Sequence, residues 1–213
     1  IEKLAHPERF GGKEEDAFDV IAPSLPGYGF SGRPAHPIGP RKMADIFNKF
    51  MTKNLGYKNY LAQGGDWGAT ISNWLGYDHP KTCSGIHINC LTMRHPEGPQ
   101  NKEEKDWQIK FDKDQKMQDG YRTQQATKPQ TLSYGMMDSP VGIAAWILEK
   151  FYFWSDIENE DIESVYSKDI LLSNIMVYLV TKTFNTASWI YYGRVGEGGR
   201  FFPKEGLPIK VPT

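Results

Sequence analysis

The sequence predicts an α/β fold in which a parallel sheet carries an inserted block of helices, and three observations support this prediction. Between residues 18 and 90, short apolar segments alternate with helical patterns, which is the spacing of β–α–β units. Residues 93–195 then hold helical patterns without strands. A glycine-rich turn at residues 64–68 joins a predicted strand directly to a helix. We therefore expect a core in residues 1–92, a helical lid in residues 93–195 and a return to the core in residues 196–213.

The composition narrows the class of protein. A chain of 213 residues can bury a core and suits one domain, or one domain with an insertion. A formal net charge of −1, without a clustered stripe of Lys and Arg, argues against a nucleic-acid surface. No apolar run approaches the roughly 18 residues that cross a bilayer, and no secretory signal opens the chain. Cys83 and Cys90 match no metal-ligand spacing and are expected to be reduced, packed thiols.

The first part of the predicted core is a strand followed by a loop. Residues 18–22 are a short apolar segment of the buried type, which Pro23 ends. Residues 23–31 are rich in Gly and Pro and predict a loop. This loop is either a structural turn or a ligand-binding loop at the carboxyl end of a strand, where open α/β sheets bind their ligands.

The rest of the predicted core alternates helix and strand. Residues 41–55 place their apolar side chains three and four positions apart, so they predict an amphipathic helix, and Gly56 suits its end. Residues 59–63 predict a strand, residues 69–77 a helix and residues 85–90 the next strand.

Asp66 lies at the centre of the glycine-rich turn. The pattern small–x–nucleophile–x–small is typical of a nucleophile elbow, in which a strained turn presents the nucleophile above the end of its strand. Gly64 and Gly68 are expected there because side chains at both positions would collide. A carboxylate in this place attacks an sp³ carbon and holds the product as an ester. The alternative is an ordinary turn in which Asp66 caps the following helix.

The predicted lid consists of four helices. Residues 103–125 are polar and helix-prone, and Lys128 with Pro129 ends that helix. Ser139 and Pro140 predict the cap and first turn of a helix over residues 141–154, which is apolar nearly all round and is therefore expected to be buried. Residues 168–182 and 185–193 predict two further helices, and residues 207–212 predict the lead-in to a strand.

Several segments together resemble the α/β-hydrolase-fold epoxide hydrolases, in particular their microsomal-type and fungal-type branch. These segments read VIAPSLPGYGFS at residues 20–31, GGDWG at 64–68, QATKPQT at 125–131, DSPVG at 138–142 and WILEKF at 146–151. Their order and spacing match across nearly the whole chain. The resemblance implies an α/β-hydrolase core with a helical lid, no cofactor, no metal site and a small apolar epoxide as substrate.

The resemblance also implies roles for individual residues. Asp66 would attack an epoxide carbon, and two lid tyrosines would hydrogen-bond the epoxide oxygen and protonate the alkoxide as it forms. Tyr121 matches the first tyrosine, and Tyr191 matches the second, with Tyr192 one residue away as the alternative. The backbone N–H of Trp67 is the expected oxyanion donor, because it follows the nucleophile.

The expected substrate contacts are Pro26, Tyr28, Trp67 and Tyr192. The family's second oxyanion donor is expected before Ile1, and its catalytic histidine and acid after Thr213, so the chain is expected to be part of a longer one. None of the five histidines is well placed to serve as the base. A possible homodimer and a cytoplasmic location complete the expectations, with membrane attachment through an earlier segment left open.

Two other functions stay open at this point. Haloalkane dehalogenases also resemble the turn, because there too an Asp is followed by a Trp, whose indole N–H helps to hold the halide. The tyrosines of the lid favour the epoxide hydrolases over them. A truncated, non-catalytic module that binds an apolar ligand or partner is the third possibility.

Overall fold

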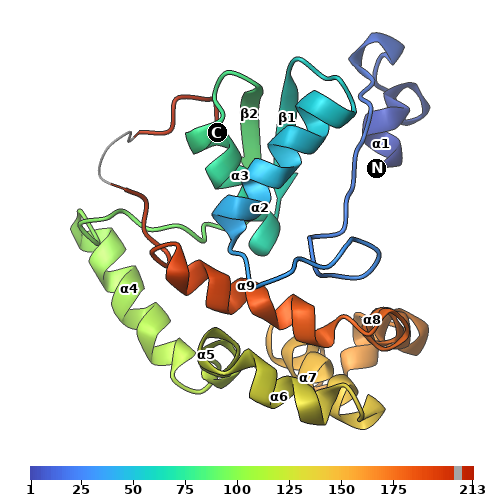
Figure 1. Cartoon of the computed structure of the whole chain (residues 1–213), viewed down its shortest axis with the longest axis vertical. Helices are drawn as coiled ribbons and strands as arrows, with labels where there is room; N and C mark the ends of the chain where they lie inside the picture. Colours follow the sequence, from blue (N-terminus) through green and yellow to red (C-terminus); the bar gives the residue numbers. More distant parts are fainter. Residues whose placement is uncertain (204–207) are drawn as a thin grey trace.

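A parallel β–α–β unit forms the centre of the core (Figure 1). The computed structural model describes residues 1–203 and 208–213. Strand β1 (Tyr60–Gly64) pairs in parallel with β2 (Cys83–Ile88), with Gly64 opposite Ile88. Helix α3 (Trp67–Asp78) connects the two strands and begins directly after Asp66. The predicted strands and the helix between them are thus confirmed, with bounds that differ by one or two residues.

Helix α2 (Pro40–Lys49) packs against α3 and continues into a π-helical turn (Phe50–Asn54), so the helix predicted over residues 41–55 is confirmed. Gly56 follows with φ of 79°, a conformation that glycine adopts without strain. Ahead of α2, the chain forms only α1 (Glu2–Ala5) and two 3₁₀ turns (Pro7–Phe10 and Glu14–Asp16).

The strand predicted over residues 18–22 is wrong. This segment belongs to no strand, and Phe18 and Ile21 are 49% and 38% exposed. Its one backbone bond to a distant segment runs from the N–H of Phe18 to the carbonyl of Leu4. A strand needs a neighbour along its edge, and within the described residues none lies beside this segment. The loop predicted over residues 23–31 is confirmed.

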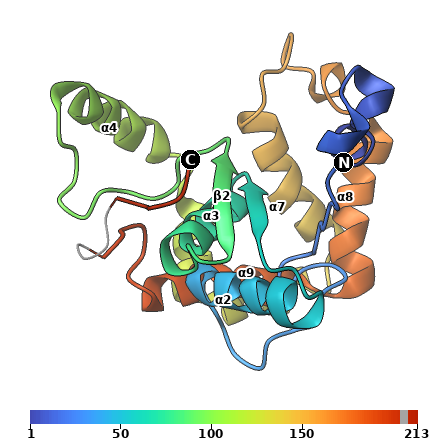
Figure 2. The ribbon, with the colours of Figure 1, turned by 90° about the horizontal axis from the view of Figure 1, so that it is seen from above.

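Six helices form a layer against the core, which we call the helical layer (Figures 1 and 2). Side chains of Asn101, Ser139 and Ser167 cap three of them by accepting a backbone N–H. The helices, with a 3₁₀ turn (Ile162–Ser164) before the fifth, are α4 (Lys102–Gln115), α5 (Gly120–Thr127), α6 (Pro129–Met136), α7 (Pro140–Phe153), α8 (Lys168–Thr181) and α9 (Phe184–Gly196).

The helical layer departs from the sequence prediction at two places. The single helix expected over residues 103–125 breaks at residues 116–119, where Gln118 N–H donates to Gln115 O and the weak helix former Gly120 starts α5. Helix α6 was not predicted, although a proline at its first position is a start signal. Helices α7, α8 and α9 are confirmed.

Helix α7 was expected to be buried, and this is wrong. Only Ile143 is fully buried, and Val141 is 78% exposed. One stripe of the helix packs against α8 and another lines a cavity. The apolar residues of α7 therefore cover two separate faces, and the helix as a whole is not enclosed.

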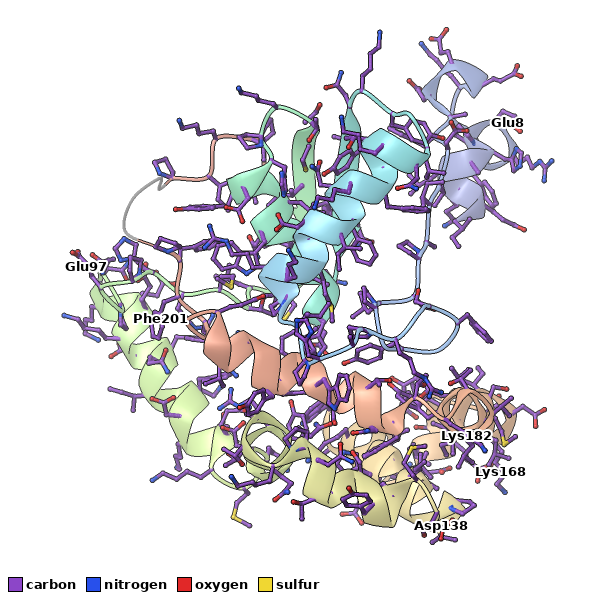
Figure 3. The ribbon with its side chains drawn as sticks, viewed as in Figure 1. Glu8, Glu97, Asp138, Lys168, Lys182 and Phe201 are labelled. Carbon is purple, nitrogen blue, oxygen red and sulfur yellow. The ribbon has the colours of Figure 1, made fainter. Side chains whose placement is uncertain are left out.

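The core continues from α3 into α9 and the end of the chain. Met43, Trp74 and Ile190 belong to one buried cluster, which joins α2, α3 and α9. The segment 208–213 forms no strand, but Pro212 O accepts the N–H of Ile86 in β2. Leu207, part of the predicted lead-in, lies outside the described residues. Phe201 forms a bridge with Arg94 at the opposite end of the layer from Asp138 (Figure 3).

Cys83 is buried and Cys90 is exposed, and both are free thiols. The prediction of packed thiols is therefore right for Cys83 and wrong for Cys90, which lies beyond the end of β2. No helix among the described residues is long and apolar enough to cross a membrane.

Candidate active site

Asp66 occupies a strained bend between β1 and α3. Its φ of 47° and ψ of −119° lie in a region that favours glycine. A Cβ on Gly64 would lie 2.2 Å from the carbonyl carbon of Gly68, so only glycine fits at residue 64. A Cβ on Gly68 would meet nothing within 4 Å, so the expected collision at residue 68 is wrong. The steric restriction therefore applies to residue 64 alone, because a Cβ there would collide with the backbone of Gly68.

The turn is not a helix cap made by Asp66. The side chain of Asp66 accepts no capping hydrogen bond, although its backbone carbonyl accepts from Thr70 N–H. The carboxylate is instead the polar floor of a cavity of about 440 Å³ between the core and the helical layer. The walls of this cavity are largely aromatic and come from the loop 23–31, α3, α5, α7–α9 and the segment just before α8. They include Tyr28, Trp67, Tyr121, Trp146, Phe151, Trp154, Tyr166, Tyr178, Phe184 and Tyr191.

Asp66 is an exposed residue that lines this cavity, so its burial by the surrounding protein is partial. This burial raises the pKa of Asp66 above its ordinary value, and the Arg194 guanidinium and the N–H of Trp67 partly offset the increase. A carboxylate that is poorly solvated is a stronger nucleophile than one in water.

Two phenols approach the same cavity from different helices. Tyr121 comes from α5 and Tyr191 from α9, and their ring centroids lie 5.8 Å apart at 84°. Tyr191 also contacts Trp67 edge to face, with centroids 4.8 Å apart. Burial raises the pKa of each phenol, and the negative charge of Asp66 raises it further, so both stay protonated. Tyr192 is 51% exposed and lines no part of this cavity, so its predicted substrate contact is not supported.

The loop 23–31 places a third phenol in the wall. Thr186 Oγ1 donates to Gly27 O at 2.5 Å, and Gly29 N–H donates to Thr183 Oγ1 at 3.3 Å. The loop is thereby fixed to the start of α9 with Tyr28 lining the cavity. Pro26 lies in this loop but is not among the lining residues, so only one of the two contacts expected from the loop is supported.

Sequence reasoning missed Tyr178 and Arg194. Tyr178 lines the cavity from α8, and burial, followed by the charge of Asp66, raises its pKa. Arg194 lies three residues after Tyr191 on the same face of α9. Its guanidinium carbon is 5.1 Å from the Trp67 ring centroid, and burial, together with the nearby Arg122, lowers its pKa to about 10. The i, i+3 spacing from a tyrosine of interest is the signal that could have revealed Arg194.

The wall supplied by α7 was also missed, although its signal is in the sequence. Trp146, Lys150 and Trp154 recur every four residues, and Ile147 and Phe151 form the adjoining row. Lys150 Nζ lies 5.0 Å from the Tyr121 ring centroid, and the Trp154 ring packs against Tyr121. The aromatic stripe therefore holds Tyr121 as well as lining the cavity.

None of the five histidines, all of which are described, lines the cavity. His79 Nε2 lies 2.9 Å from Asp45 Oδ1, but at the far end of α3, about 20 Å from Asp66 at the rise of an α-helix. Within residues 1–203 and 208–213, no group of three or more His, Cys, Asp or Glu side chains converges as a metal site.

A parallel β–α–β unit, a carboxylate at a strained strand-to-helix turn and a helical layer above it define the class of α/β hydrolases with a lid. A model of the α/β-hydrolase fold matches residues 9–141, and the chain belongs to this family.

Its relatives point to a more particular group. The chain is 38% identical to a protein named "Putative epoxide hydrolase" from Stigmatella aurantiaca, over 99% of this chain and 48% of that protein. It is 34% identical to "Epoxide hydrolase 1" of Oryctolagus cuniculus, over 100% and 52%. The solved juvenile hormone epoxide hydrolase of Bombyx mori matches 90% of this chain and 44% of its own, with 34% identity and a TM-score of 0.67. The chain thus spans about half the length of these relatives.

Proposed function

We propose that this chain carries the nucleophile and two acids of an epoxide hydrolase, which converts an epoxide to a vicinal diol through an ester on Asp66. The observation that supports this most is the placement of one carboxylate at the strained turn with two protonated phenols, Tyr121 and Tyr191, in the same cavity. The relatives named epoxide hydrolases agree with it.

Ring opening needs a nucleophile and an acid at the same time. A carboxylate oxygen of Asp66 forms a bond to one epoxide carbon, and the bond from that carbon to the ring oxygen breaks. The ring oxygen leaves as an alkoxide, which is a strong base, so Tyr121 and Tyr191 bind it and one of them supplies the proton. Water then attacks the ester carbonyl with loss of a proton, and the backbone N–H of Trp67 stabilises the oxyanion. Collapse of the oxyanion breaks the bond from the carbonyl carbon to the ester oxygen, which takes up a proton and leaves as the second hydroxyl of the diol, and the Asp66 carboxylate is restored. We assign this water no base within the described residues, since no histidine lines the cavity.

The cavity also supports a substrate class. Its volume of about 440 Å³ suits a small ligand, and its walls are aromatic apart from a few polar groups. A small apolar epoxide would bury its hydrocarbon against α7 while its oxygen meets the phenols. We propose that residues 1–92 and 196–213 act as the core and residues 93–195 as the lid, and that Tyr28 and the indole of Trp67 contact the substrate.

Isotopic labelling tests the covalent step. The intact protein, in molar excess over an epoxide, is allowed one turnover in ¹⁸O-labelled water. The diol should carry unlabelled oxygen taken from Asp66, and the peptide that contains Asp66 should gain the label. A labelled diol with an unlabelled peptide would mean direct hydration, and no diol at all would favour the non-catalytic module.

Dehalogenation is the second candidate, and one observation favours it. The indole N–H of Trp67 is buried beside Tyr191, and its geometry forms no full hydrogen bond among the described residues. When Asp66 displaces a halide from an alkyl carbon, the departing halide could accept a hydrogen bond from this indole N–H. Incubation with an epoxide and with a haloalkane of similar size separates the two, because diol formation supports our proposal and halide release supports the rival.

The proposal extends to a cytoplasmic location and a homodimer. Free Cys83 and Cys90 are compatible with a reducing compartment, which favours a cytoplasmic location. Cell fractionation tests this location. Light scattering on the intact protein tests the homodimer.

A further inference from the structure

Helix α9 carries two stripes of residues, one of which lines the cavity while the other contacts the core. Phe184, Ala187 and Tyr191 recur at steps of three and four and line the cavity. Thr186, Ile190, Gly193 and Glu197 recur at the same steps about a third of a turn away. The second stripe does not face the cavity, and each of its members contacts the core.

The contacts of this second stripe are close and directional. Thr186 binds the loop 23–31 through Gly27, and Ile190 is fully buried in the cluster shared with α2 and α3. A Cβ on Gly193 would lie 2.2 Å from the carbonyl carbon of Ile38, so α9 and the backbone before α2 touch without an intervening side chain. Any side chain at residue 193 must therefore displace α9 or that backbone.

Glu197 closes the contact at the end of α9. Its Oε2 accepts the N–H of Arg41 at 2.9 Å and its Oε1 accepts the N–H of Lys42 at 3.0 Å. These N–H groups belong to the first turn of α2, where an α-helix leaves its donors unsatisfied and carries partial positive charge. A Cβ on Gly39 would lie 2.2 Å from Glu197 Oε2, so residue 39 leaves room for the carboxylate.

We infer that Gly193 and Glu197 are positioning residues for Tyr191. They join α9 to the first turn of α2, and so hold the Tyr191 phenol at a fixed place relative to Asp66, although neither residue touches the cavity. The inference rests on the proposed function, because it assigns importance to Tyr191 only as an acid in ring opening. Charged side chains at helix starts are common, but here the acceptor comes from the helix that carries the phenol.

Helix α9 offers a matched pair of glycines for the test. Gly193→Ala forces a collision with Ile38, whereas a Cβ on Gly196 would meet nothing within 4 Å. In single-turnover reactions of the intact protein with an epoxide, Gly193→Ala and Glu197→Ala should slow formation of the Asp66 ester by about tenfold or more. Gly196→Ala should leave the rate unchanged, and KM should change little in all three. Equal rates for Gly193→Ala and Gly196→Ala would overturn the inference.

A second measurement separates positioning from general loss of structure. In a Tyr191→Phe background, the effect of Glu197→Ala should shrink to about twofold or less, because the group it positions is gone. In a Tyr121→Phe background it should persist. The same loss in both backgrounds would overturn the inference. If Tyr191→Phe alone changes nothing, the proposed function is at fault instead. Should Gly193→Ala fail to fold, Glu197→Gln carries the test, since its amide has one acceptor oxygen for two N–H groups.

Discussion

Tyr191 and Tyr121 reach one cavity from helices that are supported in different ways. Tyr191 lies on α9, which contacts the loop 23–31 and α2 through hydrogen bonds and a glycine contact. Tyr121 lies on α5, which packs against α9 and α6, and its ring contacts Trp154 and Lys150 of α7. The turn at Asp66 and Tyr191 thus form a half of the site held by the core. Tyr121 belongs to a half of the site that is held by packing among the helices of the helical layer.

The difference shows how one phenol can be held at a fixed distance from Asp66 while the other moves with the helices that cover the cavity. If α4–α8 shift relative to α9, the distance from Tyr121 to Asp66 changes, whereas the distance from Tyr191 to Asp66 is held by the contacts of α9 with the core. The core-held half depends on backbone contacts that tolerate almost no change in side-chain size, as Gly64 and Gly193 show. The layer-held half depends on aromatic packing, which can adjust.

The largest effect is expected for substitution of Asp66, next to which both halves of the site place a phenol. Asp66→Ala removes the proposed nucleophile, so diol formation by the intact protein should fall by at least about 10⁴-fold. The fold should survive, because the side chain of Asp66 makes no capping bond. Initial rates with an epoxide measure the loss, and circular dichroism measures the fold. Undiminished turnover would refute the role of Asp66.

A pair of glycines tests the core-held half directly. Gly64→Ala places a Cβ against the backbone of Gly68, and should cost about 3 kcal/mol or more of the free energy of unfolding. Gly68→Ala, two residues after Asp66, places its Cβ in open space and should change stability by less than about 1 kcal/mol. Denaturant unfolding of both variants gives the comparison. Equal losses of unfolding free energy in the two variants would show that the contact between residues 64 and 68 is not what requires glycine in this turn.

The phenols themselves give smaller effects. Tyr121→Phe and Tyr191→Phe should each slow ester formation by about 10- to 100-fold, because one phenol remains to bind the alkoxide. Tyr192→Phe is the matched control, since this neighbouring side chain is exposed and lines no part of the cavity. Single-turnover rates distinguish them. A larger loss in Tyr192→Phe than in Tyr191→Phe would reverse the assignment.

The sequence predicted the features that depend on neighbouring residues. The strand, the turn and the helix around Asp66 follow from local spacing, and the cap at Ser139 from local hydrogen bonding. The choice between Tyr191 and Tyr192 needed the direction that α9 faces, which its two stripes determine only once the core is placed. Tertiary contact therefore determines which of the two neighbouring tyrosines lines the cavity, which the sequence left open.

Other features could not follow from local pattern. Residues 18–22 have the composition of a strand, but a strand also requires a neighbour, and none lies beside them in the part of the chain that the structure describes. The break between α4 and α5 orients Tyr121, yet its sequence is as helix-prone as its surroundings except at Gly120. Gly193 and Glu197 read as an ordinary helix end, because their partners lie about 150 residues earlier in the chain.

The smallest effect concerns the charge of Asp66 in the core-held half. Because the pKa of this carboxyl is raised in the folded state, the folded protein binds more protons than the unfolded chain over the window above the ordinary pKa. Stability therefore falls as pH rises through that window. Asn cannot ionise, so Asp66→Asn should be more stable than the parent near pH 7, by up to about 1 kcal/mol given the open side of the cavity.

The difference should disappear below about pH 3, where Asp66 is protonated in both states. Denaturant unfolding at both pH values measures it, and the surface exchange Asp156→Asn controls for the change in net charge. A variant less stable than the parent near pH 7, or a gain that persists at low pH, would contradict the assignment of burial as the cause. A gain confined to neutral pH would mean that the core holds the Asp66 carboxylate at a cost to stability, as expected of a group placed for the proposed reaction.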